Sequence, residues 1–292
     1  MDNQPIRKMK RFCSLKHYRM LSLILIAVAV LLRTLNLFLF YEADIGYYQH
    51  GAMLPVVLRV LLLLATVLFA VLAFGMEAPL SPQRHTATSA VAFAVGATFA
   101  ITALLRYCAS APEMSRPAIF LFLTGGLSAI YFILFALRKL PAPAALITGF
   151  GAILGFGCIL VSSYFDVYVA MNAPIKLALL LACLGGMLLL LAEMRHVCAA
   201  QKKRFYFFAL SSATLYLCTS SIPSLIADVA GLLPARDLAF ADLPCLALGM
   251  FGIIRLLGPF GEEAVAKDTP AVEEAADSCD EAEDTPDSID AD

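Results

Sequence analysis

The 292-residue sequence contains no tryptophan and little charge, since only 15% of its residues are Asp, Glu, Lys or Arg. Soluble domains carry about 25% charged and about 45–50% apolar residues, whereas 61% of this chain is apolar. A water-soluble fold could not bury that much apolar surface. No basic surface remains outside the apolar runs, which excludes nucleic-acid binding. The composition predicts a protein embedded in the lipid bilayer.

The sequence also lacks the motifs of common catalytic and metal sites. Its eight cysteines include no C-x-x-C pair and its four histidines no H-x-x-x-H pair, so no metal or haem site is predicted. A P-loop, a dinucleotide fingerprint, G-x-S-x-G and H-E-x-x-H are all missing. We therefore expect no enzyme activity and no cofactor. Cys108 and Cys245 fall near the same predicted face, where either a disulfide or two free thiols fit the sequence.

Eight apolar runs have about the 20 residues that a helix needs to cross a bilayer. They cover 21–41, 52–75, 88–107, 117–137, 144–165, 174–194, 205–228 and 238–257. The predicted fold is an all-α, polytopic transmembrane helix bundle of about eight spans. A basic segment, 1–20, precedes the bundle at 21–259, and an acidic segment, 260–292, follows it.

The basic residues predict the orientation of the bundle. Alternating the eight spans places 15 Lys and Arg on the side of the N-terminus and only four on the other side. Because positive flanks stay in the cytoplasm, both termini are predicted to be cytoplasmic, in a multi-pass protein of the plasma membrane. The first run is interrupted by Arg33 and has no small-x-small cleavage site, so it is interpreted as an uncleaved span and not as a signal peptide.

The segment 260–292 holds thirteen acidic residues and one Lys, whereas the rest of the chain has a net charge of +10. The segment has too little apolar surface to offset the conformational entropy that it would lose on folding. This predicts a disordered cytoplasmic tail. One interpretation is a solvated tail without a specific partner. The alternative is that the tail docks on the basic N-terminus or inner loops, or contacts a cytoplasmic protein.

Two arginines lie inside predicted spans. Arg33 is in the first span and Arg59 in the second, both roughly 10–12 Å below the outer surface by their residue count. One interpretation is that they extend to the surface or form salt bridges between helices. The other is an outward-opening polar vestibule that holds a small anion or carboxylate.

The seventh span is unusually polar. It contains Pro223 and seven hydroxyl residues between 211 and 224, which predicts a kinked helix that faces protein. The hydroxyls either serve helix packing or line a solute cavity. The candidate solute-binding residues are accordingly Arg33, Arg59, Ser212, Tyr216 and Ser220.

Small residues at four-residue spacing predict close helix contacts in the third, fifth and sixth spans. They are Ala92, Gly96 and Ala100, then Gly151 and Gly155, then Ala182 and Gly186.

The two halves of the sequence carry Tyr, Asp, Pro and basic residues at similar positions. One interpretation is a four-plus-four parallel repeat, and the alternative is coincidence imposed by the shared membrane environment. A real repeat would place a functional site between the halves.

Two short segments carry a resemblance. One contains Asn172, Pro174, Lys176, Glu193 and Arg195, and the other contains Glu42, Asp44, Gly46, Tyr47 and Gly51. They resemble uncharacterised multi-pass membrane proteins of anaerobic Gram-positive bacteria, and this resemblance implies membrane location without a known activity. Helix chemistry alone also fits the first segment: Asn172 would cap a helix, Lys176 would reach the outer surface, and Glu193 with Arg195 would close the inner end.

The preferred functional hypothesis is a transporter-like or permease-like protein for a small polar solute, because of the polar seventh span. The alternative is a non-transporting membrane sensor or scaffold whose acidic tail contacts a cytoplasmic partner. No acidic residue lies at mid-membrane depth, which argues against coupling to protons or sodium.

Overall fold

The computed structural model describes residues 15–43, 45–75, 81–82, 86–109, 116–165, 170, 172–198, 203–233, 241–258 and 260–261. The predicted basic start up to residue 14, Asp44 and the acidic residues from 262 lie outside this part of the chain. The helices are α1 Leu15–Leu39, α2 Leu54–Gly75, α3 Thr86–Ala109, α4 Arg116–Ala136, α5 Ala142–Tyr164, α6 Pro174–Val197, α7 Lys203–Val229 and α8 Asp242–Leu257. The strands are β1 Tyr41–Glu42, β2 Tyr47–Tyr48, β3 Ser81–Pro82 and β4 Phe260–Gly261.

Seven of these helices, α1 to α7, are long and apolar enough to cross a membrane. The eighth, α8, has 16 residues, about 24 Å of helix. It runs antiparallel to α3 over most of the length of that helix. Pro244, in its first turn, lines the same cavity as Arg106, and Gly258, which follows its last turn, lies beside Thr88. The predicted all-α membrane bundle is therefore confirmed.

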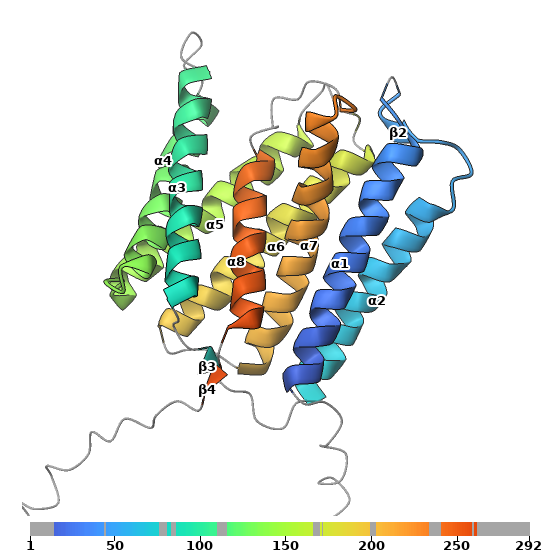
Figure 1. Cartoon of the computed structure of the whole chain (residues 1–292). Coiled ribbons are helices and arrows are strands. Elements are labelled where there is room, and N and C mark those ends of the chain that lie inside the picture. Colours follow the sequence, from blue (N-terminus) through green and yellow to red (C-terminus); the bar gives the residue numbers. More distant parts are fainter. Residues whose placement is uncertain are drawn as a thin grey trace, which may run out of the picture.

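Helix α7 is the most buried of the seven long helices and lies at the centre of the bundle. It packs against α6, α8, α1 and α2. Figure 1 shows α1 and α2 on one flank, α3 and α4 on the other, and α5 to α8 between them. A helix in this position has no face left for lipid, which explains why the seventh span tolerates so many hydroxyl groups.

The start of α1 and the end of α8 lie at the same end of the bundle, called the terminal end below, and the opposite end is called the distal end (Figure 1). Arg19 Nη2 donates to the carbonyl oxygen of Gly258 at 2.6 Å. Strand β3, which precedes α3, pairs with β4, which follows α8. The distal end carries the β1–β2 hairpin. The two ends of the described chain therefore lie at the same end of the bundle. Because seven of the eight helices are long and apolar enough to cross a membrane, the even number of crossings stays a prediction.

The two halves of the chain pack differently. In the second half α6 and α7 are in close contact, whereas α2 and α3 lie on opposite flanks (Figure 1). The α1–α2 and α3–α4 contacts have counterparts in α5–α6 and α7–α8, whereas the extensive α6–α7 contact has no comparable counterpart between α2 and α3. The four-plus-four repeat therefore stays a prediction.

The predicted small-residue faces do lie at helix contacts. A Cβ on Gly96 of α3 would stand 3.1 Å from the carbonyl oxygen of Ala129 on α4, and one on Gly186 of α6 would stand 3.0 Å from the ring of Phe156 on α5. Because lipid is as apolar as the helices themselves, such close backbone approach supplies much of the attraction between membrane helices.

Candidate functional site

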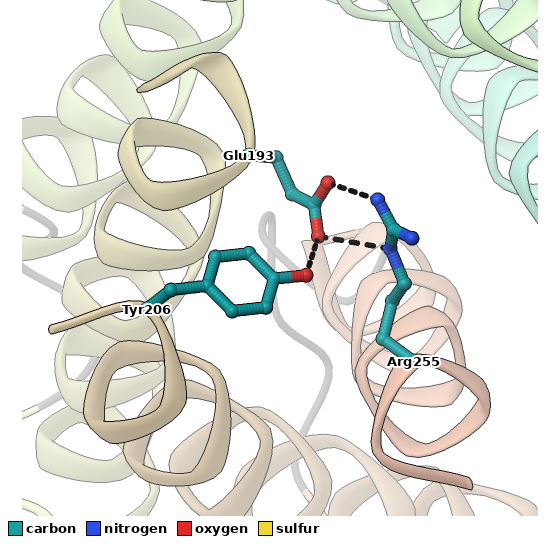
Figure 2. A network of polar contacts seen from close by, with 3 residues as sticks. All are labelled: Glu193, Tyr206 and Arg255. Carbon is teal, nitrogen blue, oxygen red and sulfur yellow. Dashed lines mark hydrogen bonds and ion pairs between the residues drawn. The ribbon is translucent and has the colours of Figure 1, made fainter. Parts of the chain in front are cut away.

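A buried ion pair joins α6 to α8 at the terminal end of the bundle (Figure 2). Arg255 Nε donates to Glu193 Oε1 at 3.0 Å, and Arg255 Nη2 donates to Glu193 Oε2 at 2.6 Å. The hydroxyl of Tyr206, in the first turns of α7, donates to the same Oε1 at 2.5 Å. Glu193 and Arg255 are each only 1% exposed. The network therefore ties three helices together in a region without solvent.

Aromatic rings complete the surroundings of this ion pair. The guanidinium carbon of Arg255 lies 5.3 Å from the ring centre of Phe135 on α4 and 5.6 Å from that of Phe251 on α8. Cation–π contact of this kind becomes stronger when the cation is desolvated. The desolvation of both charges is offset by their mutual attraction and by well-formed hydrogen bonds. Together these contacts close the terminal end around α4, α6, α7 and α8.

A cavity lies in the distal half of the bundle, between α3, α4, α5 and α8. It contains about 370 Å³ of empty space, its open mouth included, and the centre of a water molecule fits into about 30 Å³ of it. Its walls are mostly apolar, with Phe99, Leu121, Phe156 and Ile159 among them. The site is therefore a narrow cleft that runs from the distal end toward the middle of the bundle.

The polar side chains of the cleft are Arg106 and three hydroxyl residues, Thr102, Thr124 and Ser128. The hydroxyls donate to carbonyl oxygens of their own helices at 2.8 to 2.9 Å. Arg106 differs, because its Nε and Nη2 are buried and have no hydrogen-bond partner among the described groups. The carboxylate of Asp242 interacts with Arg106 electrostatically, but no ion pair forms between these two described residues.

The structure places the two predicted arginines away from this cleft. Arg33 faces the bundle from α1 and is 5% exposed, whereas Arg59 lies on the exposed face of α2. Burial raises the pKa of Tyr48 in the distal hairpin, and the positive charges of Arg33 and Arg59 oppose that rise. Both arginines therefore lie near the same phenol, and neither lines the cavity.

The predicted residues of the seventh span are directed to different helix contacts. The hydroxyl of Tyr216 lies 2.8 Å from that of Thr66 on α2. Ser212 and Ser220 are buried, 1% and 2% exposed, and neither lines the cavity. Nearby, Ser211 accepts a hydrogen bond of 2.8 Å from Tyr18 on α1. Helix packing thus accounts for part of the polar character of α7, and a solute site made of these residues stays a prediction.

The structure also bears on three smaller predictions, two for the sixth span and one for the cysteines. Helix α6 has Ala173 at its N-cap position, so Asn172 does not cap it. Lys176 is only 4% exposed and does not reach the surface. Cys108 and Cys245 are both free thiols, the first exposed and the second buried. Among the described residues no three His, Cys, Asp or Glu side chains are grouped closely enough to hold a metal ion.

Sequence reasoning missed the cleft and the Glu193–Arg255 pair. Arg106 contributes to the sequence prediction only as one of the four basic residues on the side opposite the N-terminus. Thr102 lies one helical turn before it, and Thr124 and Ser128 are also one turn apart. Two neighbouring spans with polar side chains at this spacing are a signal that could have been found. No local pattern connects Glu193 with Arg255, because 62 residues separate them.

A comparison with protein-family models finds no match, and comparisons with curated proteins and with solved structures find none either.

Proposed function

We propose that this integral membrane protein is permease-like and moves a small polar solute across the bilayer without converting it chemically. The proposal is supported by the asymmetry between the two ends of the bundle. The distal half holds a half-open cleft with an arginine whose Nε and Nη2 have no hydrogen-bond partner in the described structure, while Glu193, Arg255 and Tyr206 close the terminal end. A carrier in one of its two alternating states has this asymmetry, because only one end opens at a time.

The proposal includes the predicted orientation, with the terminal end in the cytoplasm of the plasma membrane. The positive-inside distribution of 15 Lys and Arg against four supports it. The resemblance to membrane proteins of anaerobic Gram-positive bacteria is kept as part of the same proposal. In this orientation the cleft receives solute from outside the cell, and the buried ion pair is the closed inner gate.

Cysteine accessibility tests the proposal without knowledge of the solute. In a variant whose eight native cysteines are replaced by serine, Thr102→Cys places one thiol in the cleft. Ile101→Cys is the matched control, because Ile101 is the preceding residue of α3 and is 57% exposed on the outside of the bundle. A membrane-impermeant maleimide is then added from either side of sealed vesicles.

We expect the cleft thiol to react from the distal side. Adding Glu193→Gln, which removes one charge of the inner gate, shifts a carrier toward the state open at the terminal end and slows this reaction. Tyr206→Phe is a milder gate variant that removes only one hydrogen bond and shifts the rate in the same direction. If labelling of the cleft is unchanged in both folded gate variants, alternating access is wrong, and the sensor or scaffold hypothesis is favoured.

A further inference from the structure

We propose that the cleft beside Arg106 binds an unbranched carboxylate, with its anionic group at Arg106 and its apolar chain directed toward Phe99. This inference rests on the proposed function and deepens it, since it narrows the small polar solute of the same site to an acid that is polar at its carboxylate end only. Binding can be measured without transport, so the two proposals can fail separately.

The chemistry of the Arg106 edge selects the anionic group. The two buried nitrogens without a partner, Nε and Nη2, are the same two that Arg255 uses to bind the carboxylate of Glu193. This edge of a guanidinium donates two parallel hydrogen bonds that match the spacing of carboxylate oxygens. The contact between Arg255 and Glu193 is therefore an example, within this protein, of the contact that Nε and Nη2 of Arg106 would make with a bound carboxylate.

The walls of the cleft select an apolar chain. Thr102, Thr124 and Ser128 already donate their hydroxyl protons to their own helices, so they have no donor left for a sugar or polyol. The remaining walls include Phe99 and Phe156. A ligand with many polar groups would leave them unsatisfied there, at a cost that an alkyl chain avoids.

The dimensions of the cleft favour a slim and short ligand. Only about 30 Å³ of the space admits the centre of a water molecule, so the cleft is narrow and favours an unbranched ligand over a bulky one. Arg106 and Phe99 are seven residues apart on α3, on the order of 10 Å along the helix axis. That distance is comparable with the extended length of octanoate.

Thermal unfolding of the purified full-length protein tests the inference. The probes are the sodium salts of acetate, butyrate, hexanoate and octanoate, with sodium chloride as the ionic control and hexanol as the uncharged control. The variants are Arg106→Gln, which removes the charge, and Arg106→Lys, which keeps it. Arg59→Gln is the matched control, because it removes an exposed arginine outside the cleft.

We expect stabilisation of the wild type to increase with chain length and to be absent with hexanol. Loss of the two-point contact in Arg106→Gln weakens apparent hexanoate affinity about tenfold or more, Arg106→Lys has an intermediate effect, and Arg59→Gln binds as the wild type does. Thr102→Leu fills the cleft one turn below the guanidinium and selectively weakens octanoate. Equal stabilisation of Arg106→Gln and wild type, or no stabilisation by any carboxylate, would overturn the inference.

The ligand can enter from water or from the bilayer, and competition distinguishes these sources. Palmitate in lipid nanodiscs displaces hexanoate if the cleft also accepts chains from the membrane, and fails to do so if it accepts only short acids from water. Hexanoate binding without hexanoate uptake into proteoliposomes would contradict the proposed function and leave the binding site intact.

Discussion

The guanidinium of Arg255 binds the carboxylate of Glu193 through two hydrogen bonds of 3.0 and 2.6 Å, at a place where neither side chain is more than 1% exposed. Both residues come from helices that are mostly apolar. Removing one partner of such a pair leaves an uncompensated buried charge, whereas replacing both by apolar residues often costs little. This difference is measurable and leads to the first prediction.

Glu193→Leu and Arg255→Met should each destabilise the protein by about 3–5 kcal/mol, because each leaves one charge alone in the bundle. The double variant should lose much less than the sum of the two. Chemical unfolding in detergent of the wild type, both single variants and the double variant measures the coupling. Additive losses would mean that the two residues stabilise the fold independently.

Tyr206→Phe should cost about 1.5–3 kcal/mol, since its hydroxyl donates to a charged carboxylate. Tyr216→Phe is a matched control on the same helix, because among the described residues its hydroxyl bonds only to the neutral hydroxyl of Thr66. Hydrogen bonds of that kind between membrane helices average about 0.6 kcal/mol. The same unfolding measurement applies, and equal losses in the two variants would contradict a special role of the charged acceptor.

Gly252→Ala should destabilise the protein by about 1–3 kcal/mol through overpacking, because the added Cβ would overlap Thr214 Oγ1 on α7. Gly126→Ala is the control, since nothing lies within 4 Å of its added Cβ, and it should be neutral or stabilising by up to about 1 kcal/mol. Thr214→Ala should restore part of the stability lost in Gly252→Ala. No recovery in this double variant would show that the loss arises elsewhere.

Truncation after Gly261 should leave membrane insertion and the thermal midpoint unchanged. The removed segment holds the predicted acidic tail, whereas Phe260 and Gly261 pair with Ser81 and Pro82 at the terminal end and are retained. Membrane fractionation and thermal unfolding of the two chains check this. Loss of insertion would contradict the prediction that the tail is disordered and independent of the bundle.

The helices themselves were largely predictable. Residues 174–194 and 52–75 are continuous apolar runs, and the observed α6 and α2 nearly coincide with them. Boundaries differ where polar residues extend a helix beyond the apolar run. Helix α1 begins at Leu15, six residues before the predicted span, because helical geometry continues past the hydrocarbon region. The interpretation of small residues as packing faces followed from the same local spacing.

The candidate site was not predictable in the same way. Arg33 and Arg59 were grouped by their depth in the membrane, yet one faces the bundle and the other lies on its surface. Depth follows from counting residues along one helix, whereas the direction of a side chain depends on how that helix is rotated against its neighbours. Hydropathy gives little information on this rotation, because the lipid-facing and protein-facing sides of a membrane helix are similarly apolar.

By itself the sequence determined that this chain forms an apolar helix bundle in a membrane, with an uneven distribution of charge along the chain, because run length and the positions of Lys and Arg are local properties. Only the tertiary structure decided that Glu193 meets Arg255 and that Arg106 faces a narrow cleft. Both facts depend on contacts between helices far apart in the chain, and those contacts are selected by close packing, which no single span encodes.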